Sequence, residues 1–180
     1  MGLFNLFNKK EKLPEMNDLV WKNQTAKYNG LLALIEQYQD AVWICWFSET
    51  QTSSNFFIKS RNVKQIDIRL ARTVQPSMVE NRPVVFLEHY PLRLEEEKLI
   101  ENWNPKQIFV LNSLDEPLFE AFGGERIVHL MESLGMQEDE QIQHAMISKS
   151  IKRAQEKLQE KVNFENTATS QKDWFRMNIG

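Results

Sequence analysis

The segment Ala41–Phe47, AVWICWF, is a continuous run of apolar, β-branched and aromatic residues. Strands that are covered on both faces of a sheet have this pattern, whereas half-exposed strands alternate polar and apolar residues. We therefore predict that this segment is a strand inside a mostly parallel sheet. Because parallel strands need crossover connections, the sequence on either side should supply helices.

The flanking sequence alternates between strand and helix patterns. The three further predicted strands are Val63–Leu70 (VKQIDIRL), Val84–Leu87 (VVFL) and Gln107–Leu111 (QIFVL). The predicted helices are Gln24–Gln39, Ser53–Ser60 and Leu94–Trp103, with Ser48–Thr52 as a turn and Asn17–Val20 as a lead into the first helix. This alternation predicts an α/β fold with a mostly parallel, RecA-like sheet of about four strands flanked by helices.

The sequence after Glu116 is helical and forms a C-terminal extension. We expect a short helix ending at Gly123-Gly124, a helix over Glu125–Leu134, and a last helix beginning near Gln141 or Met146. The last helix has a narrow apolar stripe, which needs a covering surface on this domain or on another chain. The candidate protein-binding residues are Ile147, Ile151, Leu158 and Val162 from this stripe, with Trp174 and Phe175 from the tail.

The predicted boundaries divide the chain into an N-terminal tail (1–14), a sheet domain (15–135) and a helical extension (136–180). In the tail, Leu3, Phe4, Leu6 and Phe7 precede three lysines. Apolar side chains beside lysines can rest on an anionic membrane surface, so these four residues are candidates for membrane contact. The alternative is a frayed or locally docked tail.

Composition excludes several classes of protein. The 180 residues carry a formal charge of −3, which argues against a nucleic-acid binder. A single cysteine, Cys45, excludes an intrachain disulfide framework. No run of about 20 apolar residues and no secretory signal is visible. We therefore expect a cytoplasmic protein, with peripheral contact at the inner face of the membrane as a variant.

Two blocks of sequence carry a family resemblance. The first is DLVWKNQTAKYNGLLALIEQYQDAVWICWFSET (18–50). The second runs from Gln107 (QIFVLNSLDEPLF) to about Phe164, and its most informative part is LFEAFGGERIVHLMESLGMQEDEQIQHAMISKSIKRAQEKLQEK (118–161). The first resembles the entry to the second nucleotide-binding domain of the SecA preprotein-translocase ATPase. The second resembles the segment in which that domain passes into the long scaffold helix. The resemblance implies a RecA-like fold and descent from a translocation motor.

The nucleotide-binding motifs of that family have no counterpart in this sequence. It contains no Gly-x-x-x-x-Gly-Lys-Ser/Thr loop, and the glycine-rich and arginine-finger motifs expected between Arg72 and Lys106 are replaced. Arg82 and Arg93 are the only arginines within that replacement. Hydrolysis of ATP needs phosphate binding, a metal ion and charge stabilisation together. We therefore expect no catalytic residues, no cofactor and no metal.

The residues that follow the predicted strand Val84–Leu87 suit acid–base chemistry. Glu88 and His89 follow it, at the edge where α/β domains usually place their sites, and a Glu–His pair can act as a general base. The acidic run Glu95–Glu97 is interpreted as a solvated helix start. We interpret His129 as a packing or surface residue and His144 as a capping or packing residue.

Our leading hypothesis is a non-catalytic SecA-like interaction module. It would be an accessory of protein translocation that binds the motor, the channel or a preprotein. One alternative is a cryptic nucleotide-binding or hydrolase domain centred on Glu88, His89 and Arg93. The other is a peripheral membrane adaptor that is attached through Leu3, Phe4, Leu6 and Phe7.

Overall fold

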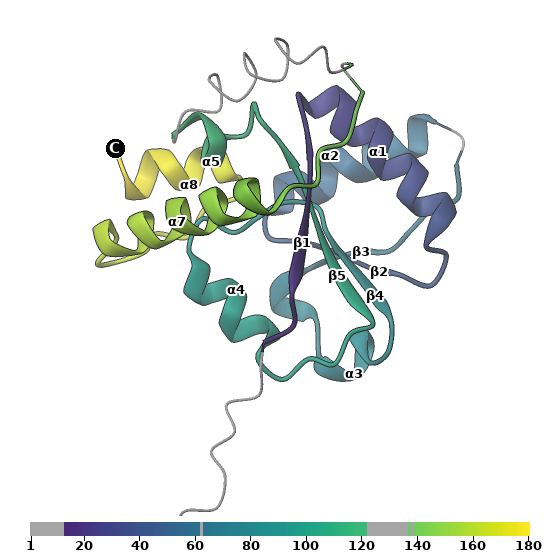
Figure 1. Cartoon of the computed structure of the whole chain (residues 1–180), viewed down its shortest axis with the longest axis horizontal. Helices are drawn as coiled ribbons and strands as arrows, with labels where there is room; N and C mark the ends of the chain where they lie inside the picture. The colour runs from purple at the N-terminus through teal and green to yellow at the C-terminus, as the bar shows by residue number, and fades with distance from the viewer. Residues whose placement is uncertain (1–12, 62, 122–136, 138) are drawn as a thin grey trace, which may run out of the picture.

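Five parallel strands form one sheet in the order β1-β5-β4-β2-β3 (Figure 1). The computed structural model describes residues 13–61, 63–121, 137 and 139–180. The strands are β1 (Met16–Trp21), β2 (Val42–Cys45), β3 (Ile68–Leu70), β4 (Pro83–Phe86) and β5 (Gln107–Ser113). The helices are α1 (Gln24–Gln37), α2 (Ser48–Ser60), α3 (Pro76–Val79), α4 (Arg93–Ile100), α5 (Pro117–Glu120), α7 (Ala145–Lys161) and α8 (Gln171–Asn178). A single 3₁₀ turn, Ala71–Thr73, follows β3.

The predicted α/β class is confirmed, with two corrections to the strands and one to a helix. β1 was not predicted as a strand, so the sheet has five strands rather than about four. β3 is shorter than predicted because residues 64–67 are mostly polar and exposed. Ser48–Thr52 is the beginning of α2 rather than a turn.

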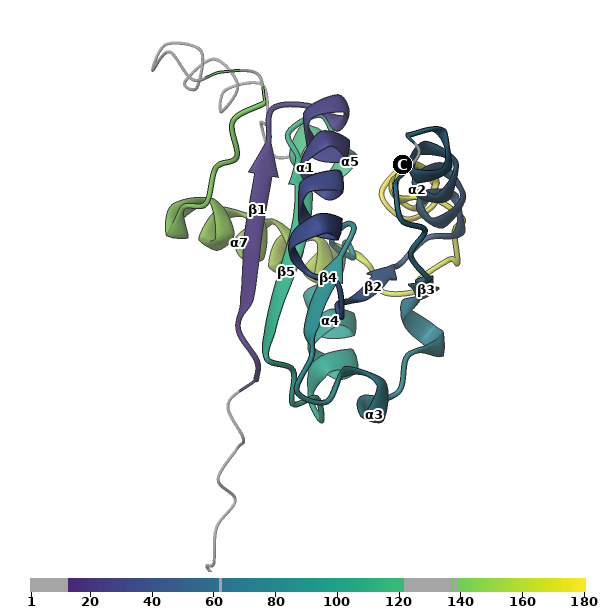
Figure 2. The same cartoon turned by 90° about the vertical axis from the view of Figure 1, so that its right-hand side faces the viewer.

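Helices cover both faces of the sheet, as the AVWICWF segment predicted. Trp43 and Cys45 of β2 pack in the same core as residues of α1 and α2. Val42 and Ile44 belong to a second core, which also contains Val79 of α3 and residues of α4. Successive residues of a strand point to opposite faces, so a doubly covered strand is apolar throughout. Figure 2 shows β1 at one edge of the sheet and β3 at the other.

A third core joins the C-terminal helices to the sheet domain. Ile151, Ala154 and Leu158 of α7 and Trp174 of α8 are buried there, together with Val20, Leu92, Leu114 and Leu118. The segment before α7 pairs with β1 through an antiparallel bridge between Val20 and Ile142. The apolar stripe of the last helix is therefore covered by the chain's own sheet domain.

The local sequence explains where α7 begins. The side chain of His144 accepts a hydrogen bond from the Met146 N–H at 3.2 Å, which satisfies one free donor of the first turn. The helix thus begins at Ala145, close to the predicted Met146, and the interpretation of His144 as a capping residue is confirmed. No helix among the described residues is long and apolar enough to cross a membrane.

Several predictions lie outside the described residues. They concern Leu3, Phe4, Leu6, Phe7, Gly123-Gly124, His129 and the helix predicted over Glu125–Leu134.

Candidate functional site

A cavity of about 780 Å³ lies at the carboxyl ends of the strands. Parallel α/β sheets usually bind their ligands at this edge. Residues from α1, α2 and α8, and from the segments after β4 and β5, line the cavity. The lining residues with charged side chains are Lys27, Glu49, Glu88, Asp115, Glu116, Glu120 and Lys172.

Glu88 occupies the N-terminal end of α2. Its Oε1 accepts hydrogen bonds from the backbone N–H groups of Trp46 and Phe47, both at 3.1 Å, and its Oε2 accepts one from the Thr50 hydroxyl at 2.6 Å. Phe47 is the N-cap of α2 and its own side chain makes no capping bond. The carboxylate of Glu88 therefore lies where an α/β domain can hold the phosphate of a ligand.

Burial changes the acidity of Glu88. The loss of solvent raises its pKa to about 7, although the Thr50 hydrogen bond and the positive charge of Lys27 act in the opposite direction. Near neutral pH this side chain is therefore divided between its charged and neutral forms.

A buried ion pair lies beside Glu88. The ammonium group of Lys27 on α1 donates to Oε1 of Glu116, which follows β5. Gln24 Nε2 and Ser113 Oγ also approach this oxygen, both at 3.4 Å. Burial raises the pKa of Glu116, and the charge of Lys27 opposes this effect. The second oxygen, Oε2, is buried and has no hydrogen-bond partner among the described residues.

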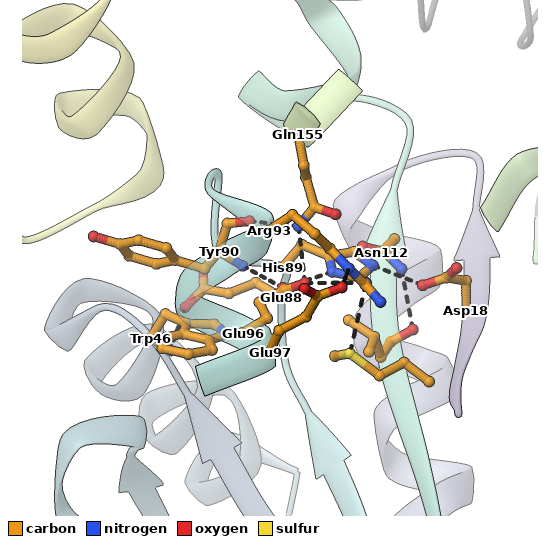
Figure 3. Close-up of polar contacts among 12 residues, drawn as sticks. Asp18, Trp46, Glu88, His89, Tyr90, Arg93, Glu96, Glu97, Asn112 and Gln155 are labelled. Carbon is orange, nitrogen blue, oxygen red and sulfur yellow. Dashed lines mark hydrogen bonds and ion pairs between the residues drawn. The ribbon is translucent and has the colours of Figure 1, made fainter. Parts of the chain in front are cut away.

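His89 makes a different set of contacts, which Figure 3 shows together with those of Glu96. Its Nδ1 lies 2.7 Å from Oε1 of Glu96 and its Nε2 lies 2.6 Å from Oδ1 of Asp18. Two carboxylate acceptors require both ring nitrogens to donate, so the geometry fits an imidazolium. Burial alone would lower the pKa of His89, but the charges of Glu96 and Asp18 outweigh it and raise the pKa to about 10.

Glu96 joins this ion cluster to the surrounding elements. Its Oε1 also accepts the Tyr90 N–H at 2.8 Å, and its Oε2 accepts Nε2 of Gln155, on α7, at 2.9 Å. Gln155 Nε2 also donates to the Tyr90 carbonyl at 2.7 Å. The network therefore connects the end of β4 to α4 and α7. The solvated interpretation of Glu95–Glu97 is wrong for Glu96, which is fully buried.

The two residues that the sequence placed in one pair have separate roles. Glu88 lines the 780 Å³ cavity, whereas His89 lines a second cavity of about 720 Å³ together with Arg93. Arg93 is held by Glu97 at 2.9 Å. These contacts do not form a Glu–His dyad.

The candidate protein-binding residues are mostly core residues. Ile151, Leu158 and Trp174 are buried, and Ile147, Val162 and Phe175 are half-buried. A partner could reach the buried three only if α7 and α8 left the sheet domain. Binding of a partner through these residues therefore stays a prediction.

Sequence reasoning missed Asp18, Lys27, Glu96 and Glu116. Lys27 carried a usable signal, because it lies one helical turn before Leu31 on the buried side of α1. Asp18 carried one as well, because it precedes the apolar Leu19–Trp21 segment of β1. Among the described residues, no cluster of three histidine, cysteine or acidic side chains could hold a metal ion.

Comparison with known proteins places these features in an evolutionary context. No protein-family model matches the chain. The protein translocase subunit SecA of Chlorobium phaeobacteroides is 26% identical over 193 aligned positions, which cover 85% of this chain and 19% of the relative. SecA of Chlorobium luteolum is 25% identical over 81% of the chain and 18% of the relative.

A shorter match has a higher identity. SecA of Christiangramia forsetii is 56% identical over 48 residues, which cover 27% of this chain and 4% of the relative. The chain is homologous to SecA. It spans less than a fifth of the length of these SecA proteins.

Proposed function

We propose that this SecA homologue is a non-catalytic interaction module that acts in protein translocation. The observation that carries the proposal is the position of Glu88. Its carboxylate accepts the backbone N–H groups of Trp46 and Phe47, which immediately precede α2, and the hydroxyl of Thr50 in the first turn. A negative side chain thus lies beside the helix end at which a nucleotide-binding domain would hold a phosphate. The sheet and the C-terminal helices are retained, while the anion-binding position holds a negative side chain.

The charge of the cavity supports the loss of nucleotide binding. Five carboxylates and two lysines line it, which leaves a formal excess of three negative charges. Like charges in a partly buried site repel strongly because little water screens them. A nucleoside triphosphate would have to enter against this repulsion and displace Glu88 from α2.

The partner would be a protein: the translocation motor, its channel or a preprotein. Homology to SecA supports this context, in the cytoplasm or at the inner face of the membrane. The apolar side chains still exposed on the C-terminal segments are Met146, Phe164, Met177 and Ile179. Phe164 is 91% exposed, and Asn166 bonds to the Met177 carbonyl, so the segment after α7 runs beside the end of α8. Exposed apolar side chains of this kind can serve as contact points.

A pull-down with point variants tests the partner. Tagged chain would be incubated with extract of the native host, and bound SecA and channel subunits quantified by mass spectrometry. We expect wild type to recover one of them and Phe164→Ser with Met177→Ser to lose most of it. Phe56→Ser is the matched control, because Phe56 is 77% exposed on α2, a different element. Equal recovery by all variants, or recovery of no translocation component, would contradict the proposal.

Point variants are preferable to deletion of residues 141–180. Deletion would remove α7 and α8 and expose Val20, Leu92 and Leu118 of the third core. A loss of binding would then report unfolding.

A separate experiment tests the proposal that the chain is not a catalyst. Purified chain should show no magnesium-dependent ATP turnover above the buffer background. Turnover that is present in wild type and abolished in Glu88→Gln would overturn it.

A further inference from the structure

The cavity at the carboxyl edge contains a charged oxygen that lacks a partner. Glu116 is only 4% exposed, and its Oε2 has no hydrogen-bond donor among the described residues. Of the buried side-chain atoms without hydrogen-bond partners among the described residues, it is the one that belongs to an ionisable group. Buried carboxylate oxygens are nearly always hydrogen-bonded, because leaving them without a donor costs the free energy of desolvation with nothing in return. The site therefore needs one more donor.

The surroundings indicate a positively charged donor. Lys27 already occupies Oε1 of Glu116, and the lining carboxylates still outnumber the lysines by three. Glu88 and Glu116 lie inside the cavity, while Asp115 and Glu120 are exposed beside it. A cation that entered the cavity would be attracted by each of these carboxylates, and an anion would be repelled.

The walls indicate an organic cation. Tyr28 and Phe175 line the cavity, and the Tyr28 ring is stacked on Phe57 at 4.7 Å between centroids, which holds it in place. Aromatic walls suit an aliphatic stem, and carboxylates suit an ammonium head group. A volume of about 780 Å³ lies within the usual range of small-molecule sites. The described side chains do not form a cluster that could hold a metal ion, so the charge fits an organic ligand better.

We propose that this cavity binds an alkylammonium group, carried either by a lysine side chain of a polypeptide or by a free amine. The ammonium group would lie between Glu88 and Glu116, and its stem would lie along Tyr28 and Phe175. The inference depends on the geometry of the cavity alone. It holds whether or not the chain acts in translocation, and the pull-down result does not bear on it.

The titration of Glu88 gives the site a pH dependence. Burial raises the pKa of Glu88 to about 7, so the side chain ionises as the pH rises from 6 to 8. Ammonium binding should strengthen over that interval by roughly threefold to tenfold, in line with the gain in ionised Glu88. The other titratable groups near Glu88 are Lys27 on α1, Cys45 on β2, Glu49 on α2, Glu116 after β5 and Lys172 on α8.

Calorimetric titration of the full chain with matched probes tests the proposal. The probes are a ten-residue uncharged peptide with one central lysine, the same peptide with norleucine, and 1,5-diaminopentane. Norleucine keeps the stem and removes the charge. We expect the lysine peptide or the diamine to bind, with the norleucine peptide at least tenfold weaker than its lysine counterpart. Binding by the peptide alone identifies a polypeptide ligand, and equal or tighter binding by the diamine identifies a free amine.

Two variants distinguish binding at this cavity from a general effect of the chain's charge on binding. Glu88→Gln keeps an acceptor for Trp46 and Phe47, so it should fold, and we expect it to bind at least tenfold more weakly at pH 8. Glu156→Gln makes the same charge change on the exposed side of α7, and we expect no effect. If Glu88→Gln fails to fold, Asp115→Asn at the exposed edge should weaken binding several-fold.

The proposal is overturned by any of three results. One is that neither the lysine peptide nor the diamine binds. Another is that the lysine and norleucine peptides bind equally. The third is that Glu88→Gln, or Asp115→Asn in its place, binds as tightly as wild type.

Discussion

Glu88 and His89 are neighbours in sequence but belong to two different kinds of site. On the His89 side, both imidazole nitrogens and both oxygens of Glu96 have partners, and the cluster joins three elements. On the Glu88 side, an oxygen of Glu116 has none, and the cavity has an excess of negative charge. Buried charges with satisfied hydrogen bonds hold a fold together, whereas unsatisfied ones indicate a missing ligand. The comparison therefore assigns structure to the His89 cluster and binding to the cavity around Glu116, although the oxygens of the neighbouring Glu88 both have donors.

Removing Glu96 should produce the largest effect if the His89 side is structural. Glu96→Ala leaves His89, Tyr90 and Gln155 without their shared acceptor, and breaking a buried ion pair costs about 3–5 kcal/mol. Urea denaturation measures the change in the free energy of unfolding. Glu95→Ala is the control, because Glu95 pairs with Lys98 at the surface and should cost less than about 1 kcal/mol. Similar losses for both variants would refute the structural role.

Leu158→Ala tests whether α7 is a fixed part of the domain. Leu158 is 2% exposed, and truncating a buried leucine typically costs about 2–5 kcal/mol. Thermal and urea denaturation should both show the loss, while Lys157→Ala on the exposed side should change stability by less than about 0.5 kcal/mol. A neutral Leu158→Ala would mean that α7 separates from the sheet in solution and is free for a partner.

Glu88→Gln should increase stability, which is the opposite of the Glu96 result. The pKa of Glu88 is raised from its ordinary 4.5 to about 7, so its contribution to stability is complete below pH 4.5 and is lost as the pH rises through 7. Glutamine avoids the buried charge. We expect a gain of about 1–3 kcal/mol at pH 8 and none at pH 4.5. A loss of stability at pH 8 would show that Glu88 is a structural cap rather than a strained binding group.

The His89 cluster should respond to pH in a different interval. The pKa of His89 is raised from 6.5 to about 10, so its contribution is complete below pH 6.5 and is lost as the pH rises through 10. The free energy of unfolding should fall by up to about 1.4 kcal/mol per pH unit between pH 7 and 9. Nitrogen NMR of the imidazoles should show His89 protonated at pH 8. A neutral His89 at pH 8 would contradict this prediction.

The sequence predicted the doubly covered layers of the fold well, because apolar runs such as AVWICWF leave few alternatives. It did not predict β1, whose first residues, Met16–Asp18, are polar or only partly buried. β1 is an edge strand whose one strand partner among the described residues is β5, with a single bridge to Ile142 on its other side, and edge strands carry a weaker pattern. Its partner lies about 90 residues away, and no local signal reports such a pairing.

The candidate site was harder to predict because it depends on contacts between distant segments. The sequence located Glu88 and His89 at the correct edge, but their partners, Asp18, Lys27, Glu96 and Glu116, come from other elements. The acidic run around Glu96 has the composition of a solvated helix start, and only the arrangement of α4 against α7 buries one of its members. The apolar patterns of single segments therefore predicted the layers of the fold. Tertiary contacts between distant segments determine which charged side chains are buried together, and no local pattern contains them.

The pairing of β1 with β5 also sets the order of events during synthesis. Met16 pairs with Ile108 and Trp21 with Ser113, so β1 can join β5 in the sheet only after β5 has emerged from the ribosome. At about 5–20 residues per second, β1 waits for roughly 5–20 s with its apolar residues unpaired. During that interval the nascent chain presents Leu19, Val20 and Trp21 to any chaperone near the exit tunnel.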